Sequence, residues 1–216
     1  MNVIMIVFGF VLLLGLLYYE KKQDRKPLLI VKSVLSLLFV VTALLQAHPS
    51  QAYYHYLLAG LIFCLIGDIF LALPQKRAFM AGLVAFLVGH VFYIFGFSSL
   101  TQVDDWVSPW LFIIFGLSAF IFLRLRPHLK SMLIPVLFYI LVITVMVSGA
   151  WAVFWKSSFP ISGSVFILIG SLCFYCSDIF VARNKFIKEE YRNRLLGLPL
   201  YYTGQFLLAF SIGLLK

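Results

Sequence analysis

Two aspartates, Asp68 and Asp178, each lie inside a long apolar stretch, in the similar segments Gly-Asp-Ile-Phe-Leu-Ala and Ser-Asp-Ile-Phe-Val-Ala. A carboxylate in such a stretch costs several kcal/mol unless it is paired, protonated or in contact with water, so these residues are candidates for function. Two carboxyl groups in a poorly hydrated site do not both ionise easily; one stays protonated as a proton donor while the other activates water. The pair therefore predicts acid–base chemistry. The simpler alternative is that both aspartates only brace helix ends.

More polar side chains share helix faces in the neighbouring stretches. His90 and Tyr93 are three residues apart, and Tyr201 and Gln205 are four apart, so each pair points in one direction. Tyr202 points elsewhere. We expect these pairs in one polar cavity near the inner leaflet, with three residues from other stretches: Lys32, Tyr139 and Tyr175. The simpler alternatives are a histidine that only satisfies a hydrogen bond between helices and a lysine that only snorkels to the interface.

Metal and nucleophilic chemistry have less support in the sequence. His48 and His55 lie at the outer boundary and His128 lies in a connection, so a three-histidine zinc site is not available and only an Asp, Asp, His90 set stays open. The sequence contains no Gly-x-Ser-x-Gly motif. Its three cysteines lie inside apolar stretches and indicate neither a disulfide framework nor a zinc knuckle. We expect no metal and no cofactor.

The elements that must position these groups are apolar helices. Of the 216 residues, 63% are hydrophobic and 12% are charged, far from the balance of a soluble domain. Each apolar run is close to the ~20 residues that a helix needs to cross a bilayer. They predict an all-α bundle of eight transmembrane helices, in a single domain over residues 1–216, without cleavage of the first run as a signal peptide. The expected spans are residues 2–19, 28–47, 55–73, 79–98, 109–123, 131–154, 162–182 and 195–215.

The basic residues are distributed unevenly among the connections. Fourteen of the 17 lie in the first, third, fifth and seventh connections. The positive-inside rule therefore places these connections in the cytoplasm and both termini outside. The net charge of +9 does not indicate a nucleic-acid partner, because no basic domain carries it. We expect a multi-pass integral membrane protein, in the inner membrane if the source is bacterial.

An internal similarity relates the two halves of the chain. Each aspartate segment is followed by a basic connection and then by a Gly-polar pair, Gly89-His90 in one half and Gly204-Gln205 in the other. The pattern is consistent with a four-plus-four duplication. An even number of spans per half gives a parallel repeat, which would bring the two aspartates to similar depth on opposite sides of a central cavity.

These motifs resemble the YhhN-like membrane proteins, a family that includes bacterial and animal lysoplasmalogenases. The resemblance rests, in chain order, on Lys32, the segment 67–71, Gly89-His90 with Tyr93, Ser177-Asp178, Tyr201 and Gln205. It implies a lysophospholipid substrate within the lipid bilayer. It also implies hydrolysis of the vinyl ether bond of lysoplasmalogens to a fatty aldehyde and glycerophosphoethanolamine or glycerophosphocholine.

The implied reaction suits two carboxyl groups, because vinyl ether cleavage begins with protonation of the alkenyl carbon and passes through an oxocarbenium ion. Asp68 and Asp178 would divide the roles of proton donor and water activator or cation stabiliser, in either order, with His90 and Tyr201 orienting them. Lys32 and the cytoplasmic arginines would hold the phosphate.

A small membrane transporter of a lipid or another amphiphile is the alternative. Parallel repeats with polar groups near the midplane also build carriers, and Pro135 and Pro199 could break helices at similar depth. The sequence leaves the oligomeric state open.

Overall fold

The computed structural model describes residues 2–156 and 159–215, which are helical apart from short connections. Four short helical turns accompany the long helices: η1 (Val103–Trp106), η2 (Lys130–Met132), the π-helical η3 (Arg183–Ile187) and η4 (Ile212–Leu214). The long helices are α1 (Asn2–Lys22), α2 (Arg25–Leu44), α3 (Gln51–Ala72), α4 (Lys76–Ser98), α5 (Pro109–Leu129), α6 (Leu133–Lys156), α7 (Ile161–Ala182) and α8 (Tyr191–Ser211).

Seven stretches of the described residues are long and apolar enough to cross a membrane. Six of them each contain one long helix, whereas the stretch Pro109–Trp155 contains both α5 and α6. The all-α membrane bundle is therefore confirmed, and the chain is a multi-pass membrane protein. The division of Pro109–Trp155 into two spans, and with it the count of eight, stays a prediction.

Several helices extend beyond the predicted spans. α5 continues from residue 123 to Leu129, and α8 begins at Tyr191 rather than at 195. The predicted ends followed the loss of apolar residues, but charged residues continue a helix once it has left the hydrocarbon region. The expectation that Pro135 and Pro199 break helices is wrong. Pro135 is the third residue of α6, where a backbone N–H has no intrahelical acceptor to lose, and α8 continues through Pro199.

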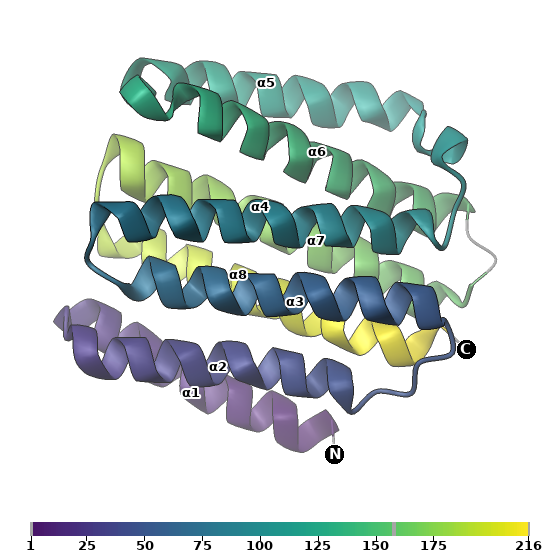
Figure 1. Ribbon diagram of the computed structural model, residues 1–216, viewed down its shortest axis with the longest axis horizontal. Helices are drawn as coiled ribbons and strands as arrows, with labels where there is room; N and C mark the ends of the chain where they lie inside the picture. The colour runs from purple at the N-terminus through teal and green to yellow at the C-terminus, as the bar shows by residue number, and fades with distance from the viewer. Residues whose placement is uncertain (1, 157–158, 216) are drawn as a thin grey trace.

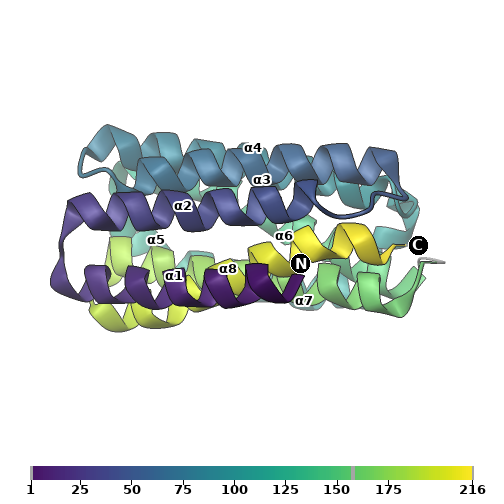
Figure 2. The same ribbon diagram turned by 90° about the horizontal axis from the view of Figure 1, so that it is seen from below.

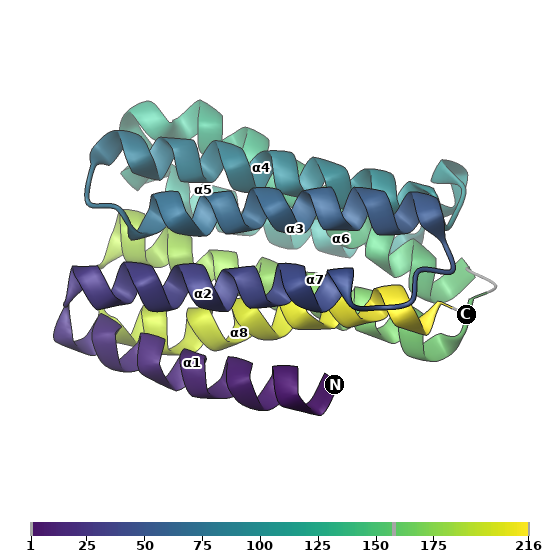
Figure 3. The same ribbon diagram turned by 60° about the horizontal axis from the view of Figure 1, so that its bottom comes forward.

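The helices run antiparallel along one long axis (Figure 1). The connections α1–α2, α3–α4, α5–α6 and α7–α8 all lie at the left end of that view, and both termini lie at the right. α1 lies at an outer edge of the bundle, against α2 and α8 (Figures 2 and 3). α8 contacts α1, α2, α3 and α7. The basic connections thus share one end, as expected; the side of the membrane they face stays a prediction.

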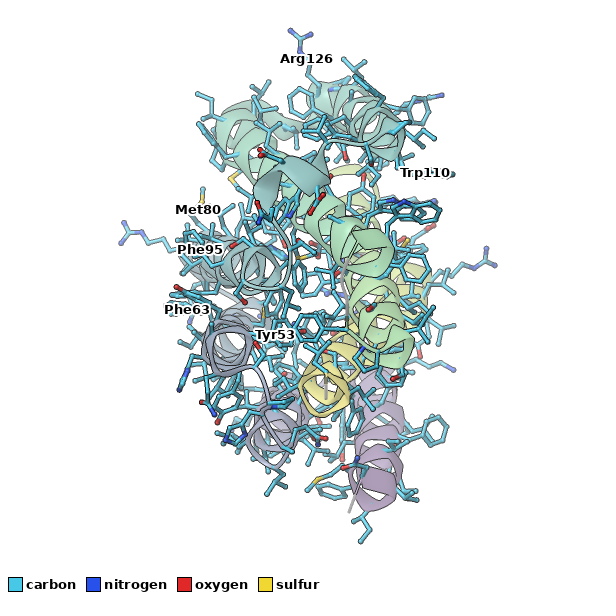
Figure 4. The ribbon with its side chains drawn as sticks, turned by 90° about the vertical axis from the view of Figure 1, so that its right-hand side faces the viewer. Tyr53, Phe63, Met80, Phe95, Trp110 and Arg126 are labelled. Atoms are coloured by element: carbon cyan, nitrogen blue, oxygen red, sulfur yellow. The ribbon has the colours of Figure 1, made fainter. Side chains whose placement is uncertain are left out.

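The distribution of apolar and polar side chains is that of a protein embedded in a lipid bilayer. Figure 4 looks along the helices, with Tyr53 pointing toward the middle of the bundle and Phe95 and Trp110 pointing away from it. The Tyr53 hydroxyl lies 2.6 Å from Oγ of Ser211, which is also buried. Apolar rings such as these therefore face outward, and polar groups such as those of Tyr53 and Ser211 pair in the interior, where no lipid can hydrogen-bond them.

Two helix pairs pack with backbone in contact, α3 with α4 and α7 with α8. A Cβ on Gly89 would lie 3.0 Å from the carbonyl oxygen of Gly60, and a Cβ on Gly204 would lie 2.7 Å from that of Gly170. Such close approach requires glycine. Gly60 and Gly170 each lie eight residues before the aspartate of their own helix. This matched packing is what a four-plus-four repeat would produce.

Replacing Gly204 by alanine should weaken the α7–α8 pair, because the added Cβ meets backbone atoms that cannot move without separating the helices. We expect a loss of about 1–3 kcal/mol of stability, seen as a lower melting temperature in detergent. Gly116→Ala is the control, since nothing lies within 4 Å of a Cβ there and the change favours the helix by roughly 0.5–1 kcal/mol. Equal melting temperatures for the two variants would contradict the close packing.

Candidate active site

A pocket of about 100 Å³ lies near the end of the bundle that carries the basic connections. A water needs roughly 10–15 Å³ by a comparable measure, so the space admits several waters or the reacting part of a longer molecule. Much of the wall is apolar, with Leu83, Phe86 and Ile140 among its residues. Six of the predicted site residues line it: Lys32, Asp68, Tyr139, Tyr175, Asp178 and Tyr201.

The two aspartates share this pocket because they occupy equivalent positions in α3 and α7. Each lies four residues before the last residue of its helix, about 6 Å along the axis. Each receives a partner from the helix that precedes its own, Lys32 of α2 for Asp68 and Tyr139 of α6 for Asp178. Both carboxyl groups therefore border one pocket at the same end of their helices.

Asp68 is almost completely buried, and both of its carboxylate oxygens are occupied. Nζ of Lys32 lies 3.1 Å from Oδ1, while Ser36 and Tyr201 donate hydrogen bonds to Oδ2 at 2.7 and 2.6 Å. The Asp68 carboxyl group therefore has a cation on one oxygen and two hydrogen-bond donors on the other. Lys32 is 4% exposed, so the alternative that it only snorkels to the interface is wrong.

A relay of hydrogen bonds fixes the orientation of the Tyr201 hydroxyl. Tyr93 donates to Oε1 of Gln205 at 2.8 Å, and Nε2 of Gln205 donates to the Tyr201 oxygen at 3.2 Å. With its oxygen accepting from Gln205, the Tyr201 hydroxyl directs its own proton to Asp68. Tyr93 and Gln205 do not line the pocket. Their hydrogen bonds orient Tyr201 and do not place either side chain against a ligand in the pocket.

Ser36 and Tyr202 belong to this network, although the sequence reasoning missed Ser36 and expected Tyr202 to point elsewhere. Oγ of Ser36 lies 3.1 Å from the Tyr202 hydroxyl, and both residues are buried. Ser36 is four residues after Lys32, hence on the same face of α2, and that spacing was the available signal. Tyr202 reaches α2 because α8 lies between α7 and α2, which a helix-face argument within α8 alone could not show.

Asp178 has different surroundings. Tyr139 donates a hydrogen bond to its Oδ2 at 2.6 Å, and no lysine or arginine of the described residues pairs with it. Its side chain is only partly buried because it borders the pocket. Asp178 thus has one hydrogen-bond donor and no cation, whereas Asp68 has a cation and two donors.

His90 is fully buried in α4 but lies outside the pocket lining. Its ring packs edge-on against Phe174 and Tyr139, with centroids 4.6 and 5.3 Å away. Neither ring nitrogen has a hydrogen-bond partner among the described residues. The structure thus links His90 to Asp178 through the Tyr139 ring and does not bring it together with the two aspartates as one metal-binding group.

Tyr175 borders the pocket, but its hydroxyl is used elsewhere. It lies 2.8 Å from Oγ of Ser118, which is 2.7 Å from Oγ1 of Thr144. These contacts join α5, α6 and α7 inside the bundle. The Tyr175 hydroxyl therefore serves packing, and the ring contributes to the pocket wall.

Replacing Lys32 by methionine should destabilise the protein by about 3–5 kcal/mol, because it leaves the Asp68 carboxylate buried without its cation. The double variant Lys32→Met with Asp68→Asn should recover most of that loss. Unfolding in detergent by heat or denaturant measures both effects. Lys26→Met, at an exposed position of the same helix, is the control. If Lys32→Met and Lys26→Met unfold alike, the buried ion pair is refuted.

Comparison with known proteins gives these residues a context. Residues 28–212 match the profile of the YhhN family. The chain is 32% identical over 178 residues to human lysoplasmalogenase TMEM86A, an alignment that covers 77% of this chain and 68% of that protein. It is 28% identical over 195 residues to a lysoplasmalogenase homolog of Dictyostelium discoideum, with coverage of 74% and 63%.

A lysoplasmalogenase of Mycobacterium bovis is 26% identical over 174 residues, with coverage of 78% and 63%. The chain therefore spans less than two thirds of the Dictyostelium and mycobacterial proteins. No solved structure matches the chain. Because the family profile covers most of the sequence, including all the residues of the pocket network, this chain belongs to the YhhN family.

Proposed function

We propose that this protein is a lysoplasmalogenase, which hydrolyses the vinyl ether bond of a lysoplasmalogen to a fatty aldehyde and a glycerophospho-base. The observation that carries the proposal is one pocket with two carboxyl groups in unlike surroundings: Asp68 neutralised by a cation, Asp178 held by a single tyrosine. The names of the human and mycobacterial relatives support the same substrate class.

Asp178 is the proton donor in this proposal. In its protonated form it transfers a proton to the alkenyl carbon that is not bonded to oxygen. The electron pair of the double bond forms the new C–H bond, and the positive charge is shared between the neighbouring carbon and the ether oxygen. Tyr139 holds the carboxyl group in place through its hydrogen bond to Oδ2. A general acid placed in this way contributes about 10²–10⁴-fold in rate.

Asp68 stays ionised and stabilises the oxocarbenium ion electrostatically. The Asp178 carboxylate, having lost its proton, then accepts a proton from water as that water attacks the charged carbon. The product is a hemiacetal. Its bond to the glycerol oxygen then breaks as its hydroxyl proton is transferred to that oxygen, which leaves the aldehyde and the glycerophospho-base. Lys32 takes no part in phosphate binding, because its ammonium group is paired with Asp68.

The proposed topology places this site near the cytoplasmic leaflet. A single helix over the 47 residues Pro109–Trp155 would be about 70 Å long, more than twice the ~30 Å hydrocarbon core. α5 and α6 instead lie side by side and antiparallel (Figure 1), which supports two spans, eight in all. With the basic connections in the cytoplasm, both termini are outside and the alkenyl chain extends along the apolar wall of the pocket.

Asp178→Asn, and Asp68→Asn combined with Lys32→Met so that no cation stays buried without its partner, should each lower aldehyde release from lysoplasmalogen by at least 10²-fold without loss of expression, because one loses the proton donor and the other the stabilising charge. The assay uses purified protein and lysoplasmalogen in detergent micelles. Asp104→Asn, at an exposed position at the other end of the bundle, should keep full activity. Near-normal turnover in both site variants would contradict the assignment of Asp68 and Asp178 as catalytic residues. No aldehyde from the wild-type protein would favour the transporter.

Turnover in D₂O should place one deuterium on the aldehyde carbon next to the carbonyl, because Asp178 exchanges its proton with solvent and delivers it to that carbon. Mass spectrometry of the aldehyde, reduced at once to the alcohol, measures the label. Unlabelled aldehyde added to the same enzyme in D₂O reports any exchange after release. Product with no solvent-derived deuterium would rule out protonation at carbon.

A further inference from the structure

A lysophospholipid carries a phosphodiester anion, and the pocket offers two cations for it. Lys32 and Arg194 both line the wall, but Lys32 is paired with Asp68 deep inside. We propose that Arg194 binds the phosphate of the substrate head group, an assignment that rests on the proposed function. Arg194 would thus be the residue that makes the pocket prefer a substrate with a phosphate group.

Contacts with α1 hold Arg194 in place. Its Nε lies 3.8 Å from Oε2 of Glu20, and the Tyr191 hydroxyl donates to the carbonyl oxygen of Leu17 at 3.2 Å. The Arg194 side chain lines the pocket and is 30% exposed, and that of Glu20, which does not line it, is 15% exposed, so the ion pair is partly shielded from solvent. Since Glu20 approaches Nε of Arg194, the two terminal amino groups of the guanidinium can bind a phosphate through two parallel hydrogen bonds.

The position of Arg194 fits the dimensions of the substrate. Arg194 and Tyr201 are seven residues apart on α8, so they share a helix face and are separated by about 10 Å along the axis. Tyr201 marks the Asp68 end of the pocket. Three glycerol carbons and two oxygens separate the vinyl carbon from phosphorus, and the flexible arginine side chain covers the remaining difference.

Four other basic residues at this end of the bundle are less suited than Arg194 to bind a phosphate in the pocket. Arg183 and Lys188 both pair with Glu190, and the ammonium of Lys185 lies over the Phe79 ring, 4.3 Å from its centroid. Arg192 is exposed, points away from the Arg194 face of α8 and does not line the pocket. Arg192 therefore provides a matched control, with the same charge in the same helical turn.

The test compares two substrates and two arginines. Arg194→Ala should raise KM for lysoplasmenylethanolamine about tenfold or more, because charge-assisted hydrogen bonds to the phosphate are lost. It should leave KM for 1-alkenylglycerol, which has no phosphate, within about twofold of the wild-type value. Arg192→Ala should change neither. An equal rise in KM with both substrates, or an equal effect of both arginines, would overturn the proposal.

Binding of a 1-alkyl lysophospholipid, which has no vinyl ether to cleave, separates this proposal from the proposed activity. Arg194→Ala should weaken that binding about tenfold or more, even if the wild-type protein releases no aldehyde from any substrate. Glu20→Gln removes the ion pair but keeps Arg194, and it should bind at least as tightly as the wild type. If Glu20→Gln loses as much affinity as Arg194→Ala, the arginine acts only through helix packing and the proposal fails.

Discussion

The structure depends on the neutralisation of one carboxylate inside an apolar helix bundle. Asp68 in α3 takes its cation from α2 and hydrogen bonds from α2 and α8, so these three helices must hold one geometry to keep the charge stable. Tyr201 is in turn oriented by Gln205, which is tied to α4 through Tyr93. No lipid can replace any of these donors, and each therefore restricts how the helices pack.

The second aspartate, Asp178, borders the same pocket but has no lysine partner among the described residues. Asp178 lies at the matching place in α7, with the same glycine eight residues earlier packed against a neighbouring helix. It has a tyrosine where Asp68 has a lysine. If the two halves arose by duplication, their common backbone brought two carboxyl groups to one pocket with different partners, a lysine, a serine and a tyrosine for Asp68 and one tyrosine for Asp178. Two carboxyl groups in like surroundings would share one proton, whereas unlike partners select which of the two carries it.

Much of this arrangement could be predicted from the sequence. Apolar runs predicted the helices, and the intramembrane aspartates with Lys32, Tyr139 and Tyr201 predicted the pocket, since buried ionisable groups in lipid must cluster. The partners within the cluster could not be predicted. That Lys32 pairs with Asp68, while His90 lies behind Tyr139, depends on rotations of whole helices about their axes, which helical spacing within one span does not fix. Several helix ends, such as the end of α5 and the start of α8, were predicted too short for a related reason, because hydropathy reports the bilayer boundary and not the last helical hydrogen bond.

The proposed mechanism requires the two carboxyl groups to differ in protonation, with Asp178 carrying the proton and Asp68 ionised. Infrared difference spectroscopy of the purified protein near neutral pH tests it most directly, because a protonated carboxyl group has a carbonyl band that a carboxylate lacks. The proposed mechanism predicts a band in the wild-type protein that Asp178→Asn removes and that Asp68→Asn combined with Lys32→Met keeps. A band that disappears in this double variant but remains in Asp178→Asn would contradict it.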